Sequence, residues 1–139
     1  MKISKELAKG STGLLVLSVI SRGEMYGYQI IKTVEMMSDN VFQMNEGTLY
    51  PILHSLEKEN FLTSRWCESE ENGRKRKYYK ITEKGLTELA KQKQEWETYS
   101  YAVGKILGGA LSTTWFLITT IGGWLYGRKQ RFSYNWRIY

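Results

Sequence analysis

The stretch Asn45–Lys58, NEGTLYPILHSLEK, decides the fold of the chain. Its apolar residues are spaced three and four positions apart, at Leu49, Ile52, Leu53 and Leu56. This spacing predicts a helix with a single buried stripe. The remaining faces carry compact, uncharged or basic residues with many hydrogen-bonding groups, as expected of a helix that enters a groove of DNA. Most amphipathic helices face only water, so the neighbouring segments must decide between these interpretations.

The start of this helix is set by its polar and cyclic residues. Asn45 or Thr48 can cap the N-terminus, since both side chains accept hydrogen bonds from free backbone N–H groups. Pro51 lacks an N–H and is tolerated only close to the first turn. We therefore expect the regular helix to begin near Thr48.

Two further helices are predicted before this stretch. The first spans about Lys5–Ser21, has a broad apolar face that includes Leu7, and ends at Arg22-Gly23. The second opens with Met25–Ile31, and its inward positions are Ile30, Ile31, Val34 and Met37. Ser38-Asp39-Asn40 then supplies residues typical of turns.

Two strand-like runs follow, Leu62–Cys67 and Lys77–Thr82. The polar segment between them contains Asn72-Gly73, a strong hairpin signal. Three helices followed by a hairpin predict a winged helix-turn-helix. Its descending arm carries four consecutive cations, Arg74–Lys77, which either form a solvated loop or contact phosphates or a minor groove. The nearby recognition-type helix favours contact.

A long helix is predicted from the capping residue Thr82 to about Leu107. Its residues spaced alternately by three and four positions are Leu86, Leu89, Lys93, Trp96, Ser100, Val103 and Leu107. This is a heptad seam interrupted by two polar residues, and a two-fold partner would bury its tryptophan. The fold class is therefore mainly α with a small β-hairpin, a winged helix-turn-helix plus a long C-terminal dimerisation helix. The predicted interface residues are Leu86, Leu89, Trp96, Val103 and Leu107.

Composition argues against catalysis and metal binding. His54 is the only histidine, so a histidine-based metal cluster is excluded, and no P-loop or dinucleotide fingerprint is present. A Cys67–His54 dyad lacks a convincing orienting group. The single Cys67 excludes an internal disulfide and is either a structural thiol or a redox sensor. We therefore expect that the protein is not an enzyme and binds neither a cofactor nor a metal. We also expect a cytoplasmic location, because no apolar export signal opens the chain.

Residues 10–108 resemble the PadR family of bacterial transcriptional regulators. The resemblance rests on Tyr26-Gly27-Tyr28, Gly47–Leu53, Leu56-Glu57, Gly73–Tyr79, and Thr82 with Gly85. It implies a cytoplasmic homodimer of the short subclass that represses promoters and releases DNA when a small molecule binds or a signal arrives. In multidrug-binding relatives a tryptophan on the long helix stacks on flat aromatic ligands at the dimer centre. Trp96 has the matching position.

The resemblance also implies an effector site around this tryptophan, formed by Trp96, Leu14, Ser18, Leu89, Lys93, Ser100 and Val103. Lys93 departs from the apolar or aromatic residue that is common at its position, which closes the pocket or favours an anionic ligand. Alternatively, Trp96 only packs the dimer interface.

The predicted partners are double-stranded DNA, a second copy of the chain and a small aromatic effector. The expected domains are a winged helix-turn-helix over residues 1–82, a dimerisation helix over 83–110, and a tail over 111–139. The candidate DNA-binding residues are Asn45, Gly47, Thr48, Tyr50, Pro51, His54, Ser55, Lys58, Arg74, Lys75, Arg76 and Lys77.

The tail includes an uncharged stretch, Ile106–Gly127, that is long enough to span a bilayer. Its many small and hydroxylated residues dilute the apolar driving force, and the basic Arg128, Lys129 and Arg131 would share the cytoplasmic side with the DNA-binding part. The alternatives are a hairpin dipping into the membrane, a packing element on the dimer, a β-prone segment at Trp115–Ile121 or an out-of-frame extension. A membrane-tethered DNA-binding sensor, or a partner-binding winged-helix module, is therefore the competing functional hypothesis.

Overall fold

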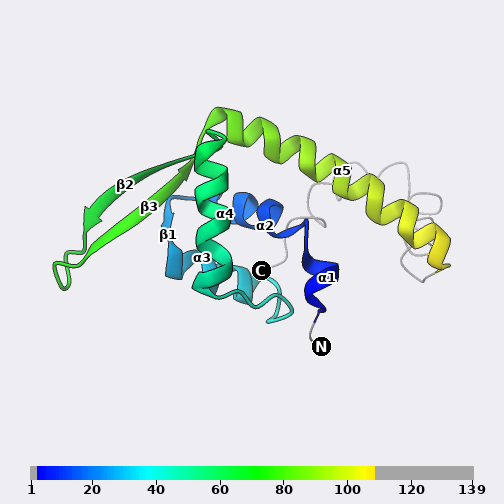
Figure 1. Cartoon of the computed structure of the whole chain (residues 1–139), viewed down its shortest axis with the longest axis horizontal. Coiled ribbons are helices and arrows are strands. Elements are labelled where there is room, and N and C mark those ends of the chain that lie inside the picture. Colours follow the sequence, from blue (N-terminus) through cyan, green and yellow to red (C-terminus); the bar gives the residue numbers. More distant parts are fainter. Residues whose placement is uncertain (1–2, 109–139) are drawn as a thin grey trace, which may run out of the picture. The chain divides into compact units, whose positions relative to one another are not determined.

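The computed structural model describes residues 3–108 (Figure 1). The chain divides into two compact units, Met1–Gln92 and Lys93–Tyr139, with the boundary inside the last helix. The predicted tail, 111–139, lies outside the described residues. The elements in chain order are α1 (Lys5–Ala8), α2 (Thr12–Ile20), β1 (Met25–Tyr26), α3 (Gly27–Met37), α4 (Glu46–Lys58), β2 (Leu62–Glu68), β3 (Lys75–Ile81) and α5 (Glu83–Leu107).

The predicted first helix, Lys5–Ser21, is wrong as one element because the chain breaks between α1 and α2. Gly10 has φ of 96°, in the left-handed region that glycine adopts readily. Ser11 Oγ donates a hydrogen bond to the carbonyl of Ala8 at 2.9 Å, which stabilises the break. Leu7 is 72% exposed rather than part of a buried face. Apolar spacing predicted a continuous helix, but local backbone geometry at the glycine ended it.

The predicted start of the second helix is also wrong, because Met25 and Tyr26 form strand β1. They pair with Tyr79 and Tyr78 of β3 in an antiparallel register. The helix α3 begins at Gly27, and the amide N–H of Tyr26 donates to Gln29 Oε1 at 3.2 Å. The free edge of a strand more than 50 residues away offered these two residues ladder hydrogen bonds, which local sequence does not reveal.

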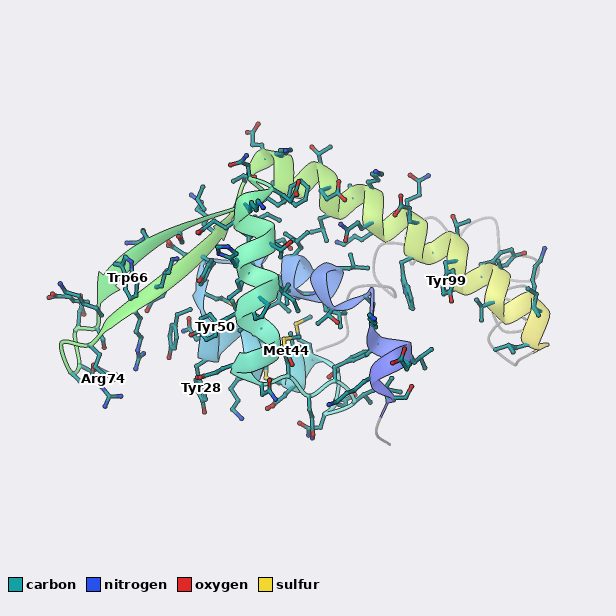
Figure 2. The ribbon with its side chains drawn as sticks, in the orientation of Figure 1. Tyr28, Met44, Tyr50, Trp66, Arg74 and Tyr99 are labelled. Atoms are coloured by element: carbon teal, nitrogen blue, oxygen red, sulfur yellow. The ribbon has the colours of Figure 1, made fainter. Side chains whose placement is uncertain are left out.

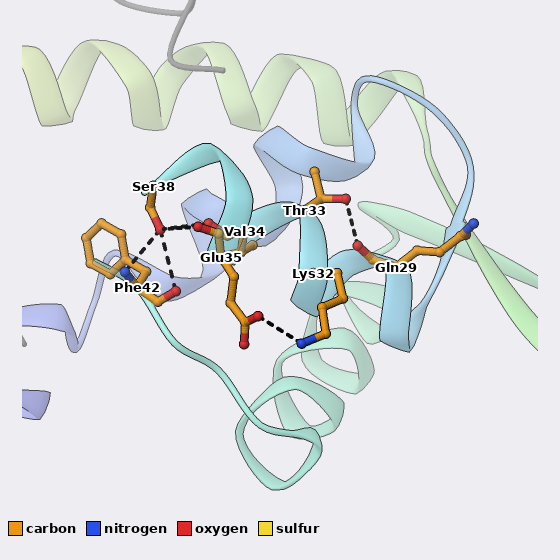
Figure 3. A network of polar contacts seen from close by, with 7 residues as sticks. All are labelled: Gln29, Lys32, Thr33, Val34, Glu35, Ser38 and Phe42. Carbon is orange, nitrogen blue, oxygen red and sulfur yellow. Dashed lines mark hydrogen bonds and ion pairs between the residues drawn. The ribbon is translucent and has the colours of Figure 1, made fainter. Parts of the chain in front are cut away.

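A tight turn joins α3 to the segment that leads into α4 (Figure 3). Ser38 Oγ donates to the carbonyl of Val34 at 2.7 Å and accepts from the amide of Phe42 at 3.1 Å. Asp39 and Asn40 both have positive φ, 50° and 62°, a conformation that short polar residues tolerate. The predicted turn is therefore confirmed, and its serine ties both ends together.

The helix α4 begins at Glu46, two residues before the expected start at Thr48. Pro51 is its sixth residue and lies in the second turn, so the carbonyl of Gly47 loses its usual helical donor. Both residues are exposed, so water can satisfy that carbonyl. The predicted buried stripe holds the helix in place: Leu49, Leu53 and Leu56 are buried and Ile52 is partly buried.

The core lies between helices α2, α3 and α4 and one face of the sheet. The fully buried side chains of the core are Leu17, Ile20, Ile30, Leu49, Leu53, Leu62 and Val16. The sheet has the order β1-β3-β2, and β2 pairs with β3 from Leu62↔Ile81 to Glu68↔Lys75. Both hairpin strands are longer than predicted, and Gly73 (φ 65°) makes the turn. The winged helix-turn-helix prediction is confirmed, with β1 as an addition.

The start of α5 is anchored on the end of α4. Thr82 caps the helix as predicted, because its Oγ1 accepts from the amide of Gly85 at 2.9 Å and donates to the carbonyl of Asn60 at 2.7 Å. A Cβ atom on Gly85 would overlap the backbone oxygen of Phe61 and lie 2.7 Å from Ile81 Cγ1. Only glycine fits this close approach. None of the helices in the described range combines the length and apolarity needed to cross a membrane.

Candidate nucleic-acid interface

The first turn of α4 presents free backbone N–H groups to solvent. Asn45 caps it, and its Oδ1 accepts the amide hydrogen of Thr48 at 2.9 Å. Glu46 and Gly47 are exposed, and a Cβ on Gly47 would lie 3.4 Å from Asn45 Oδ1, with nothing else within 4 Å. Internal packing therefore does not require glycine here. An absent side chain instead lets an anion approach the helix start closely.

The predicted contact residues of α4 form its solvent-facing side. The buried leucines hold the opposite side against the core. All eight candidates of this segment are exposed: Asn45, Gly47, Thr48, Tyr50, Pro51, His54, Ser55 and Lys58. The structure thus leaves free a polar helix face of the kind that enters a major groove.

Tyr50 is held by the start of α3, although it is 47% exposed. A Cβ on Gly27 would lie 2.9 Å from Tyr50 Oη, so a larger residue there would have to displace the phenol. The neighbouring Tyr28 (Figure 2) is 58% exposed. Lys32 Nζ lies 5.6 Å from its ring centroid. Tyr28 and Lys32 are therefore candidates for contact with the sugar-phosphate backbone of DNA. They were not identified from the sequence, although the Tyr-Gly-Tyr motif was visible in it.

The wing separates the four predicted cations into different surroundings. Arg74 is exposed in the turn, where its amide donates to Asn72 Oδ1 at 3.1 Å (Figure 2). Lys75 Nζ lies 3.9 Å from Glu68 Oε1, and both side chains are about two-thirds exposed. Such a pair contributes little to stability, so Arg74 and Lys75 remain available to phosphates.

The next two cations of the wing are engaged within the chain. The Arg76 guanidinium lies 4.4 Å from the ring centroid of Tyr26. Lys77 Nζ lies 3.7 Å from Glu57 Oε1 on α4 and 5.6 Å from the ring centroid of Tyr79. These contacts brace β3 against β1 and α4, so Arg76 and Lys77 have structural partners as well as charge.

An ion pair at the root of the wing was not anticipated from the sequence. Arg65 on β2 donates from Nε and Nη2 to the two carboxylate oxygens of Glu24, at 2.6 and 2.9 Å. This bidentate contact lowers the pKa of the Glu24 carboxyl below its ordinary value. The guanidinium also lies 5.9 Å from the ring centroid of Tyr78, so it links β2, β3 and the residue preceding β1.

Comparison with known proteins decides the family. A family model described as "Transcriptional regulator PadR-like family" matches residues 16–91, which is more than half of the chain. The chain belongs to the PadR-like family. The matched range covers the sheet, the wing and the helices α3 and α4 described above.

Solved structures of PadR regulators have the same fold. A PadR-like transcriptional regulator of Bacillus cereus is 34% identical, with 76% of this chain and 99% of that one covered and a TM-score of 0.65. A PadR family regulator of Eggerthella lenta is also 34% identical, with coverages of 73% and 86% and a TM-score of 0.63. The transcriptional regulator YqjI of Escherichia coli is 28% identical over 103 residues, 73% of this chain but only 47% of YqjI.

The predicted effector residues fall in both units of this PadR regulator. In the first unit, Leu14 and Ser18 are each 8% exposed, and Leu89 is 4% exposed within the core of its own chain. In the second unit, Trp96 is 46% exposed, and its ring centroid lies 6.0 Å from that of Tyr99. Leu89 therefore has little surface to offer either a ligand or a partner.

The other predicted effector residues in the second unit differ from one another in exposure. Lys93 and Val103 are half-buried, whereas Ser100 is exposed and its Oγ donates to the carbonyl of Glu97 at 3.2 Å. Leu107, at the end of α5, is 76% exposed. Of the predicted interface residues, Leu86 in the first unit is 48% exposed.

A hollow of about 980 Å³ lies elsewhere in the first unit, beside the start of α4. It is bounded by α1, the start of α2 and residues 40–45, and Lys5, Lys9, Phe42 and Thr48 are among its lining residues. None of the predicted effector residues lines it. Within residues 3–108 no group of three or more histidine, cysteine or acidic side chains is arranged to hold a metal ion.

Proposed function

We propose that this PadR regulator acts as a homodimeric repressor that binds a pseudo-palindromic operator. Two copies would insert their α4 helices into successive major grooves, about 10 bp apart. The exposed polar face of α4 beside a wing with two available cations is the observation that carries this proposal. Thr48, His54 and Ser55 are its candidates for base-edge contacts.

Phosphate contacts would come from the two ends of this surface. At the helix start, the exposed amides around Gly47 attract an anion. On the wing, Arg74 and Lys75 supply cations without strong partners in the chain. Phosphate contacts position the protein, whereas the side chains of α4 would select the sequence.

The proposed dimerisation rests on the apolar exposure of α5 in a single chain. Leu86, Trp96 and Leu107 are 48%, 46% and 76% exposed, and Ile106 is 86% exposed. A second copy would remove this surface from water. Sedimentation at micromolar concentration tests the association: we expect twice the chain mass of 16.2 kDa, and a stable single copy would refute the homodimer.

Selection of preferred duplexes from a random library tests the operator. The expected outcome is an enriched inverted repeat whose half-sites lie about one helical turn apart. The matched comparison is Ser55→Ala with Ser69→Ala: the first removes a hydroxyl from the exposed face of α4, the second removes one from a half-buried position before the wing turn. A library that enriches no sequence would refute the proposal.

We also propose that a planar aromatic effector binds at Trp96 and releases DNA by preferring one arrangement of the two copies. The exposed indole and the nearby Tyr99 ring support this role. Titration with a panel of planar compounds should quench tryptophan fluorescence in wild type but not in Trp96→Ala. Quenching that persists in Trp96→Ala, or that is absent across the panel, would leave packing as the role of Trp96.

A further inference from the structure

Trp66 is a large apolar side chain on the wing that the fold does not use. It lies on β2, directly opposite Lys77 of β3, and is 67% exposed (Figure 2). The other tryptophan in the described range, Trp96, is 46% exposed. Single exposed apolar residues are common, so exposure alone carries no functional meaning.

The register places Trp66 on the side of the wing that is turned towards α4. Ser64 pairs with Tyr79, which is 5% exposed and belongs to the core. Side chains alternate between the two faces of a strand, so Trp66 is on the same face as Tyr79 and Lys77. Lys77 reaches Glu57 of α4 at 3.7 Å, which identifies this as the face next to the recognition helix.

Two lysines of β3, together with Glu68 of β2, share this face with the indole. Lys77 is its cross-strand neighbour, Lys75 is the next residue of β3 on the same face, and Arg74 follows in the turn. Glu57 and Glu68 pair with the two lysines only at 3.7 and 3.9 Å, and both lysine side chains are at least one-third exposed. The exposed ammonium group of Lys75 can therefore turn to a polyanion at little cost, whereas Lys77 keeps its contact with Glu57.

We propose that Trp66 packs its indole on the sugar edge of duplex DNA beside the site occupied by α4, while Arg74 and Lys75 contact the adjacent phosphates. This assignment rests on the proposed DNA-binding function and adds a wing residue to it. Two observations select DNA as the occupant: the available cations Arg74 and Lys75 of the same wing, and the continuity of this face with the exposed face of α4. Packing of an aromatic ring on a sugar carries no sequence information.

A neutral packing contact has a different signature from a phosphate contact. Loss of Trp66 should weaken binding to specific and unrelated duplexes by the same factor, without changing the dependence of affinity on salt. Loss of a phosphate-contacting cation such as Arg74 should instead reduce the slope of log K against log salt concentration by about 0.9. The two residues can therefore be distinguished in one titration series.

The experiment measures fluorescence anisotropy of labelled duplexes with the full chain and its Trp66→Leu, Trp66→Phe and Arg74→Ala variants. We expect about tenfold weaker binding for Trp66→Leu at unchanged salt slope, and at most about threefold for Trp66→Phe, which keeps a ring. Thr63→Ala is the matched control, because Thr63 is exposed on the opposite face of the same strand. It should bind like wild type.

The outcomes separate this inference from the function on which it rests. Wild-type binding to DNA with an unaffected Trp66→Leu would refute the role of Trp66 alone. A Trp66→Leu variant with altered sedimenting mass would show that the indole covers a second copy of the chain, which also overturns the proposal. A wild-type chain that binds no duplex would instead overturn the DNA-binding function itself.

Discussion

Replacement of Gly47 by alanine should raise the stability of the protein and weaken its binding to DNA. Gly47 is the second residue of α4, is exposed and does not have a positive φ. The added methyl group would meet only Asn45 Oδ1, at 3.4 Å, an ordinary van der Waals contact. Alanine restricts the unfolded chain and favours a helix, so we expect a gain of about 0.5–1 kcal/mol in the free energy of unfolding.

The same methyl group would stand where a phosphate oxygen approaches the helix amides. This crowding would keep the phosphate from approaching the backbone closely. The loss of that contact should weaken DNA binding by about tenfold, which corresponds to about 1.4 kcal/mol. Thermal unfolding followed by circular dichroism should show a midpoint raised by about 2–6 °C. Fluorescence anisotropy with the selected operator at fixed salt measures the loss of affinity.

Gly13 provides a matched control for this experiment. It is also the second residue of a helix, α2, and a Cβ on it would meet nothing within 4 Å. Gly13→Ala should stabilise the protein to a similar extent and leave DNA affinity unchanged, provided that both variants sediment like wild type. Equal affinity of Gly47→Ala and wild type would refute the idea that glycine serves phosphate approach.

Four further substitutions test other parts of the structure. Gly85→Ala should lower the free energy of unfolding by roughly 2–4 kcal/mol, because its Cβ would overlap the backbone of Phe61; an unchanged urea midpoint would contradict the close approach. Arg76→Ala should lower the melting midpoint by removing the guanidinium from the Tyr26 ring, whereas Arg74→Ala should leave it unchanged and reduce the salt slope of DNA binding; equal midpoints would refute the separation of these two cations. Burial raises the pKa of Tyr79, and the nearby Glu57 adds to this effect, so the folded state resists ionisation of the phenol. Its contribution to stability should be fully present below the ordinary pKa of about 10 and be lost as pH rises towards the raised folded pKa. Between about pH 9 and pH 11, the urea midpoint of Tyr79→Phe should therefore fall less steeply with pH than that of wild type. Identical slopes would contradict the effect.

Much of the site could be predicted from local pattern. The leucine spacing of α4 identified both its buried stripe and its free face, because burial of one helix face dictates which side chains remain exposed. Asn72-Gly73 placed the wing turn, and Thr82 marked the start of α5. These signals depend only on residues close together in the chain.

The separate roles of the four wing cations could be assigned only from the tertiary structure. Four consecutive cations look equivalent in sequence, but strand alternation and the neighbours Tyr26, Glu57 and Glu68 give each a different environment. Trp66 likewise gained significance only when the register placed it beside Lys77. Such contacts join residues distant in the chain, so no local spacing can reveal them.

The sequence by itself determined the winged helix-turn-helix and the buried and exposed faces of α4, since apolar periodicity, caps and turn residues act over a few positions. Only the tertiary structure decided that the chain breaks at Gly10, that Met25 and Tyr26 form a strand, and that Leu89 is buried in the core of its own chain. Periodicity states which residues avoid water. The surface that covers them is settled by the packing of segments far apart in the chain.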